Sequence, residues 1–360
     1  MKFGIVVLLI AFLTSCMHSD NTSYADAIPA VAQRQGLHEF LIASQTGEYL
    51  NIYSSRHFEA DEEIFRRFTQ ETGIGINVIH ATSGQIVSRL ALEGERTGAD
   101  LIIAADGGIL SHAKAENLLQ PISSDILSSQ IPANLRDPDN YWYAMSYRAR
   151  VIAVANDIDI AVEKYEDLGA DVFSNEVLLR PGNSLYNVSL LASLIDIYGF
   201  DDAFEWAKNT YNNSARHPQG NDRDQITGIF AGTGSVTLIN SYYLGLMASS
   251  NDAMEIAAAD SVSVVFPNQQ TSGTHINISG MAVSKHANNP EIAVQFMEFM
   301  TREDMQSFIS EVNFEFPVNQ QATLNPFLQQ LGDFKIQQID FSSLHTNHIR
   351  AVEIMTVVGW

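Results

Sequence analysis

The run Asp100-Leu101-Ile102-Ile103-Ala104 is almost entirely apolar and is followed closely by the turn formers Asp106-Gly107-Gly108. Two comparable runs precede it in the chain, Leu50-Asn51-Ile52-Tyr53 and Ile76-Asn77-Val78-Ile79-His80. Short apolar runs that stop at turn formers are typical of strands in a sheet that is covered on both faces. These three runs therefore predict the strands of an α/β layer.

The segments between these runs have the pattern of helices. Residues 59–72 carry an apolar stripe and gather acidic residues in the first turn, where the helix dipole favours them. Residues 84–95 predict a second helix. Strands that alternate with helices indicate a parallel sheet, and ligands of such sheets collect beyond the carboxyl ends of the strands. We therefore expect residues 54–58 and 106–108 at a binding cleft.

The chain of 360 residues is long enough for a second domain of ordinary size. Residues 147–156 begin with charged side chains and become apolar, so they predict a strand that could carry the chain from one lobe to the other. A second α/β unit follows this strand. Its predicted strands are 177–180, 236–240 and 262–266, and its predicted helices are 189–198, 201–210 and 222–231. Another strand is predicted to return at 276–284, followed by helices at 289–300 and 302–312.

The first residues have the features of a secretory signal: Lys2, an apolar run from Ile5 to Leu13, and no acidic residue before Asp20. The apolar run is shorter than the roughly 20 residues that span a bilayer. Leu13-Thr14-Ser15-Cys16 resembles a bacterial lipobox, and this resemblance implies cleavage before Cys16 and acylation of its thiol. The alternative is a cytosolic protein with an apolar N-terminal strand and an incidental free cysteine.

We therefore expect a signal peptide over residues 1–15 and a lipid anchor and tether over residues 16–47, with a short helix near residues 30–44. Cys16 is the only cysteine of the chain, so no second cysteine is present to form an internal disulfide. The anchor would hold the folded part at the periplasmic face of a bacterial membrane.

The chain is acidic, with 20 Lys and Arg against 42 Asp and Glu and a formal net charge of −22 at pH 7. Such a surface repels the phosphate backbone of nucleic acids, so we do not expect nucleic acid as a partner. An acidic surface attracts cations, although the same negative charge can also act only to keep the protein soluble. The sequence also lacks His-Glu-x-x-His, Gly-x-Ser-x-Gly and a phosphate-binding Gly-Lys-Ser/Thr loop, so it does not predict an enzyme.

Three tyrosines stand where a ligand could be bound. Tyr242 and Tyr243 follow the predicted strand 236–240, and Tyr186 lies in a loop rich in turn formers that leads from a strand to a helix. A phenolate is a hard anionic oxygen donor, and a trivalent cation can lower the pKa of a phenol from about 10 until it ionises at neutral pH. The alternative for the Tyr242-Tyr243 pair is packing around a helix N-terminus. His57 ends the first strand, and it could be a metal ligand or a surface residue beside a helix start.

Several short blocks stand in order along the chain: Tyr-Ser-Ser-Arg-His at 53–57, Ile-Pro-Ala-Asn-Leu-Arg at 131–136, Arg-Ala-Arg-Val-Ile at 148–152, Leu-Tyr-Asn-Val-Ser-Leu at 185–190, Asn-Ser-Tyr-Tyr at 240–243, Phe-Pro-Asn-Gln at 266–269 and Thr-His-Ile-Asn-Ile-Ser-Gly at 274–280. Together, over residues 48–360, they resemble the periplasmic ferric-iron-binding proteins of bacterial ABC transporters. The resemblance implies a two-lobed, transferrin-like clamp of the periplasmic-binding-protein fold. Each lobe would be a mainly parallel sheet flanked by helices, and crossover strands would join the lobes. The lobes would comprise residues 48–148 with 275–315 and residues 149–274 with 316–360.

Carried over position by position, the resemblance makes Tyr186, Tyr242 and Tyr243 the phenolate ligands of ferric iron. His57 matches the histidine that precedes a fourth ligand tyrosine in many members, but the next residue here is Phe58. A phenylalanine side chain cannot bind a metal ion, so water, carbonate or another small anion would take the open coordination positions.

Such an anion would need a partner of positive charge. Guanidinium groups bind oxyanions with two parallel hydrogen bonds, so Arg56, Arg148 and Arg150 are candidate partners. Salt bridges at the hinge or on the surface are the alternative for these arginines.

The sequence thus predicts a monomeric, lipid-anchored and non-catalytic protein: the substrate-binding component of an ABC transporter, which captures Fe³⁺ and delivers it to a membrane permease. Two alternatives stay open. The same clamp could bind an organic anion, a ferric chelate or another metal ion, or the chain could be a secreted metal-dependent enzyme.

Overall fold

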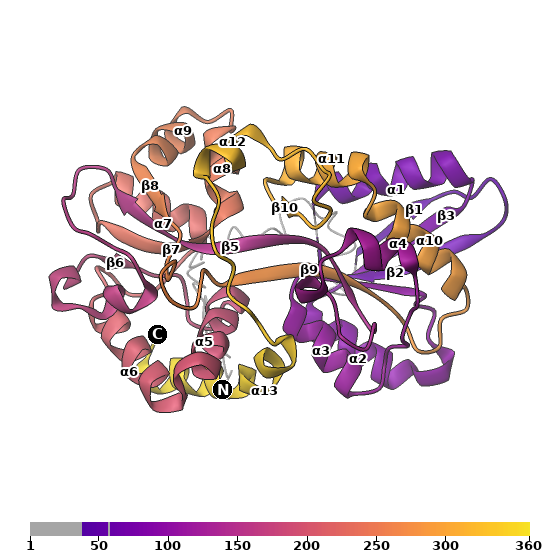
Figure 1. The fold of residues 1–360 in the computed structure, drawn as a ribbon, viewed down its shortest axis with the longest axis horizontal. Coiled ribbons are helices and arrows are strands. Elements are labelled where there is room, and N and C mark those ends of the chain that lie inside the picture. Colours follow the sequence, from indigo (N-terminus) through magenta and orange to yellow (C-terminus); the bar gives the residue numbers. More distant parts are fainter. Residues whose placement is uncertain (1–37, 57) are drawn as a thin grey trace, which may run out of the picture.

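The computed structural model describes residues 38–56 and 58–360 (Figure 1). The predicted signal peptide, the predicted anchor Cys16 and the candidate ligand His57 lie outside these ranges. Within the described ranges, none of the helices combines the length and the apolar character that a membrane span requires.

One half of the molecule is built on the three parallel strands that the sequence predicts. Strand β2 (Tyr49–Ser54) lies between β3 (Gly75–His80) and β4 (Leu101–Ala104), and Leu50 and Ile52 of β2 are fully buried. Helices lie on both faces of these strands (Figure 1). They are α1 (Glu59–Thr72), α2 (Ser83–Glu93), α3 (Gly107–Ala115), α4 (Asp125–Gln130), α10 (Pro290–Met300) and α11 (Glu303–Asn313).

A fourth strand extends this sheet where the sequence predicts a helix. Strand β1 (His38–Ile42) pairs antiparallel with β3, so the helix expected near residues 30–44 is wrong over β1. Phe40 and Ile42 pack on the core, whereas Leu41 between them is 64% exposed. This period of two is that of a strand with one buried face.

Two long strands connect the halves. β5 (Tyr143–Ala155) pairs with β9 (Ile276–Val283) over its first seven residues and then with β7 (Val236–Asn240), so it begins in one sheet and ends in the other. Figure 1 shows β5 and β9 running side by side through the middle of the molecule. The predicted crossover strands are therefore confirmed, and they join both sheets in antiparallel orientation.

The second half repeats the α/β pattern. β6 (Val177–Leu178) pairs parallel with β7, and β8 (Val262–Val265) pairs antiparallel with β5. Its helices are α5 (Leu185–Tyr198), α6 (Phe200–Asn212), α7 (Asp222–Phe230), α8 (Ser241–Ala248), α9 (Ala253–Asp260), α12 (Pro326–Leu331) and α13 (Phe341–Val358). The short strand β10 (Phe316–Pro317) returns to β5. The two-lobed α/β class is confirmed, with mixed sheets because the crossover strands run antiparallel to their neighbours.

The C-terminal helix α13 contacts both halves. Phe341 in its first turn packs on Gly107 of α3, where an added Cβ would lie 2.3 Å from the ring, and on Trp142 with ring centroids 5.2 Å apart. Beyond the other end of α13, the Trp360 indole donates to the Arg180 carbonyl at 3.0 Å. Helix α13 therefore adds packing contacts with both halves to the connections through β5 and β9.

Candidate metal-binding site

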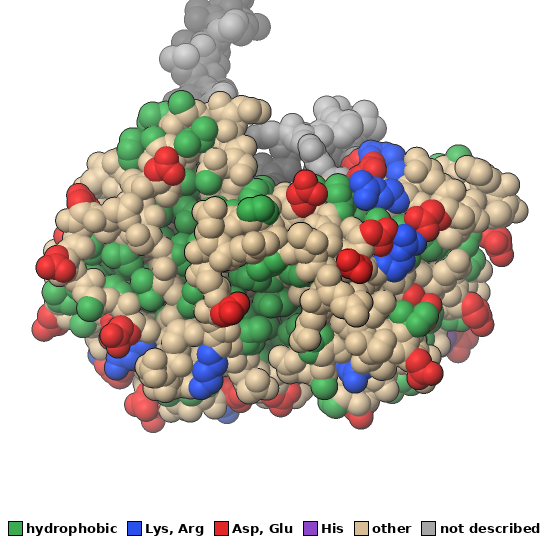
Figure 2. Space-filling view, turned by 45° about the horizontal axis from the view of Figure 1, so that its top comes forward, with side chains coloured by type: hydrophobic (Ala, Val, Ile, Leu, Met, Phe, Trp, Pro, Cys, Tyr) green, Lys and Arg blue, Asp and Glu red, His purple; other side chains and the backbone are tan. Residues whose placement is uncertain are grey.

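A cleft of about 1240 Å³ lies between the two halves. One wall comes from the strand ends and helix starts of the first half, including Ser55, Thr82 and Ala105, and the other includes Arg180 and Tyr186. Ser55 follows β2 and belongs to the predicted segment 54–58, whereas Ala105 and Ile109 line the cleft on either side of the predicted segment 106–108. Figure 2 shows one face of the molecule, with acidic side chains scattered over it and hydrophobic side chains gathered in a hollow near its middle.

The fold brings the three predicted phenols together. Tyr242 and Tyr243 occupy the first turn of α8 directly beyond the buried strand β7, and Tyr186 occupies the first turn of α5 rather than the predicted loop. The hydroxyl oxygens of Tyr186 and Tyr242 are 3.1 Å apart, and the ring centroids of Tyr242 and Tyr243 are 4.3 Å apart. Both helices begin at the carboxyl end of a strand, which explains how residues distant in the chain meet.

The phenols lie in partly apolar surroundings. Tyr242 and Tyr243 are buried and pack with Phe314, whereas Tyr186 is half-buried and lines the cleft together with Tyr243. Low polarity strengthens the attraction between an anionic oxygen and a cation. Two hydroxyl oxygens at hydrogen-bond distance can bind one metal ion together once they have lost their protons. Nowhere in the described ranges do three His, Cys, Asp or Glu side chains gather as a metal site.

The side chain of Phe58, from the first half, lies beside the phenol cluster. The Phe58 ring meets the Tyr242 ring edge-on, with centroids 6.2 Å apart, and the Arg56 guanidinium carbon lies 4.4 Å from the Phe58 centroid. Phe58 therefore contributes contact area but no oxygen donor from this side of the cleft.

Two of the three candidate anion partners are bound by protein groups at the crossover strands. Arg56 is fully buried and forms ion pairs with Asp61 and Glu315, both at 3.0 Å. Arg148 donates to the Ser279 hydroxyl at 3.2 Å and to the Ala105 carbonyl. Arg56 also donates to the Ser279 hydroxyl of β9, so both arginines tie loops of the first half to the crossover strands.

Arg150 is likewise bound internally. Its Nη1 donates to Asp222 at 2.8 Å and to the Asn240 side chain at 3.3 Å, and its Nη2 donates to the Asn187 side chain at 2.8 Å. Its guanidinium carbon lies 6.0 Å from the centroid of the Tyr186 ring. Arg150 thus borders the phenol cluster while its polar contacts go to the protein.

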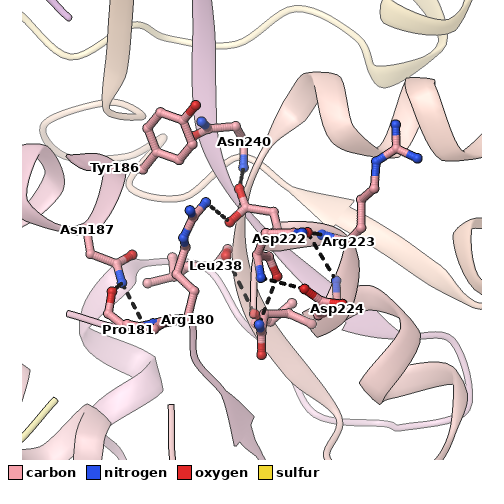
Figure 3. Close-up of polar contacts among 12 residues, drawn as sticks. Arg180, Pro181, Tyr186, Asn187, Asp222, Arg223, Asp224, Leu238 and Asn240 are labelled. Carbon is pink, nitrogen blue, oxygen red and sulfur yellow. Dashed lines mark hydrogen bonds and ion pairs between the residues drawn. The ribbon is translucent and has the colours of Figure 1, made fainter. Parts of the chain in front are cut away.

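Sequence reasoning missed a further arginine, Arg180, which lines the cleft. Its guanidinium carbon lies 4.9 Å from the Tyr186 centroid, and its Nη1 donates to Asp222 at 2.8 Å (Figure 3). Burial works against its charge, but the Asp222 carboxylate and the nearby phenols of Tyr243 and Tyr186 raise the pKa of Arg180. Its place before a Pro-Gly turn at the end of a strand is the only sequence signal for this role.

The chain is similar to iron uptake and ferric binding proteins. Residues 97–341 match the family model described as bacterial extracellular solute-binding protein. Iron uptake protein A1 of Synechocystis is 38% identical over 89% of this chain and 90% of its own length. A ferric binding protein from Campylobacter jejuni has a TM-score of 0.81 and 40% identity over 86% of this chain and 99% of its own. A Trichodesmium protein in complex with iron and citrate ligands has a TM-score of 0.81 and 39% identity, over 87% of this chain and 99% of its own.

Proposed function

The chain belongs to the family of bacterial extracellular solute-binding proteins, and from this premise we propose that it is the substrate-binding component of an ABC transporter for ferric iron. Tyr186, Tyr242 and Tyr243 bind Fe³⁺ as phenolates in the cleft between the halves. The contact of 3.1 Å between the Tyr186 and Tyr242 hydroxyl oxygens carries this proposal. The loaded protein delivers its ion to a membrane permease.

The chemistry of the donor set suits this cargo. Phenolate is a hard anionic donor, and hard donors select hard cations over soft, thiol-seeking ones. Three phenolates neutralise one trivalent ion, and binding releases their protons. Closure of the halves about β5 and β9 would then enclose the ion, since a ligand that contacts both halves favours the closed state.

A small anion such as carbonate completes the coordination, because three phenolates leave positions open and Phe58 supplies no oxygen. His57 is the remaining candidate ligand from the first half. The complex of the Trichodesmium protein with iron and citrate supports an oxyanion in this role. Arg56, Arg148 and Arg150 stay proposed partners of the anion, although each also has protein partners.

The cell location follows from the N-terminal signal. Residues 1–15 are removed, the lipid on Cys16 anchors the protein, and residues 16–47 form the tether. The folded part acts as a monomer at the periplasmic face of a bacterial membrane, with lobes 48–148 plus 275–315 and 149–274 plus 316–360. The Fe(3+)-binding periplasmic protein of Serratia marcescens is 21% identical over 88% of this chain, which supports this location.

An optical titration tests the proposal. Ferric loading of the wild-type protein should give a visible tyrosinate-to-iron charge-transfer band, and the triple change of Tyr186, Tyr242 and Tyr243 to Phe should abolish it. Tyr211→Phe, in α6, is the matched control and should keep the band. A wild-type protein that stays colourless after ferric loading would contradict the proposal.

The missing donor at Phe58 supports one alternative cargo, an intact ferric chelate or organic anion in the same cleft. Calorimetry with ferric ion, citrate and ferric citrate in parallel separates these cargoes. A cleft for an intact chelate should bind ferric citrate but neither ferric ion nor citrate alone. We propose binding rather than catalysis; substrate turnover that disappears with any one of the three tyrosines would overturn this choice.

A further inference from the structure

A buried carboxylate lies behind the phenol cluster. Asp222, the first residue of α7, is fully buried and accepts hydrogen bonds from Arg150 and Arg180, each at 2.8 Å. It also accepts one from the backbone N–H of Asn240 at 2.8 Å. Figure 3 shows Asp222 between the Arg180 guanidinium and Asn240, with the Tyr186 ring beside them. One side chain therefore contacts three segments of the second half.

These segments are the ones that carry the phenols. Asn240 is the N-cap of α8, which begins with Ser241-Tyr242-Tyr243, so the hydrogen bond that the Asn240 N–H donates to Asp222 fixes the start of that helix. The link to α5 runs through Arg150, which donates to Asn187, the neighbour of Tyr186. Asn187 in turn donates to the carbonyls of Arg180 and Pro181 at 3.1 and 3.2 Å. The network therefore joins the two helix starts whose side chains meet in the cluster.

The network also places positive charge at the phenols. Two guanidinium groups face one carboxylate, which leaves an excess of one positive charge among buried or half-buried groups. Arg180 is the nearer cation, because its guanidinium carbon lies 4.9 Å from the Tyr186 centroid against 6.0 Å for Arg150. A cation within about 6 Å of a ring centroid is attracted by the ring, and a negative charge on the phenol adds to this attraction inside a protein.

We propose that Asp222 and Arg180 are positioning residues for ferric binding, which hold the starts of α5 and α8 so that the three phenol oxygens face one ion. This inference rests on the proposed function. Residues that orient metal ligands from behind typically contribute about 10-fold to 100-fold to metal affinity. Neither residue needs to touch the ion for this effect.

The test compares ferric affinity among four variants, measured by competition with nitrilotriacetate. Asp222→Asn and Arg180→Gln should each weaken ferric binding by about 10-fold to 100-fold and shift the visible band, because the phenols lose their fixed arrangement. Arg180→Lys keeps the charge without the planar fork and should restore part of the loss. Arg223→Gln is the control: it removes an ion pair with Glu255 from the same helix α7, and it should leave affinity and band unchanged.

Thermal melts and circular dichroism establish that each variant is folded. If Asp222→Asn does not fold, Arg180→Gln decides, because Arg180 is at the cleft and loses a single ion pair. A folded Arg180→Gln protein with wild-type affinity and an unshifted band overturns the inference. The inference is also overturned if Arg180→Gln loses affinity in proportion to its fall in melting temperature and Arg180→Lys binds ferric ion no better than Arg180→Gln. A colourless wild-type protein would instead overturn the proposed function, and this inference with it.

Discussion

Replacing Asp222 with Asn should lower the free energy of unfolding by about 3–5 kcal/mol, because it removes one partner of a buried ion pair and leaves the other charge uncompensated. Asn keeps the shape of the side chain and one acceptor oxygen. It cannot neutralise Arg150, of which only 2% of the side chain is exposed, nor Arg180, of which 16% is exposed.

The hydrogen bonds give a second, independent magnitude. Asp222 accepts one charged hydrogen bond from each arginine, and each such bond contributes about 1.5–3 kcal/mol. Two of them amount to roughly 3–6 kcal/mol, which overlaps the value for a broken buried pair. Domains are stable by only about 5–15 kcal/mol, so the variant should be folded but marginal.

Urea denaturation at neutral pH measures this loss. The matched control is Asp224→Asn on the same helix, where an exposed carboxylate caps the backbone N–H of Asn221 at 2.6 Å. Asn keeps an acceptor oxygen for this bond, so the change should cost at most about 1 kcal/mol. If Asp222→Asn costs no more than Asp224→Asn, Asp222 does not stabilise this part of the protein through its two arginines.

Three further outcomes are expected. Burial, and then the charge of Arg150, lower the pKa of His275 to about 3. Its folded pKa is below the unfolded value near 6.5, so stability is retained above about pH 6.5 and should fall by about 2 kcal/mol on acidification to pH 5. His275→Gln should lessen this dependence in urea titrations, and an unchanged pH slope would argue against it. Phe58→Tyr adds a phenol beside Tyr242 and should tighten ferric binding in a chelator competition; unaltered affinity would mean that position 58 faces away from the ion. Ferric binding releases phenol protons, so the visible band should fade on acidification, and a band independent of pH would be inconsistent with phenolate ligands.

The strands of the first half could be predicted from sequence because their signal is local. β2, β3 and β4 are short apolar runs that end at turn formers, and each is found where the pattern indicates. β1 could not be predicted in this way, since its alternation becomes clear only beside its partner β3. Helix α8 was not among the predicted helices because six of the eight residues of SYYLGLMA are buried and no polar face alternates with an apolar one, which leaves no stripe to detect.

The sequence predicts the donor residues of the candidate site but not the buried ion pairs that position them. The family resemblance, together with the place of Tyr242 and Tyr243 after a strand, indicates the phenols from the amino-acid sequence alone. Asp222 has the sequence pattern of an ordinary acid at a helix start, and its burial depends on Arg150 and Arg180, which precede it by 72 and 42 residues. Only the folded chain brings these charges together, so no local pattern could have identified them.

A crystal of the iron-loaded protein, measured at the iron absorption edge, tests the central claim most directly. We expect one anomalous peak in the cleft, in direct contact with the phenol oxygens of Tyr186, Tyr242 and Tyr243. A peak bound elsewhere, or phenol oxygens that point away from the ion, would contradict this claim.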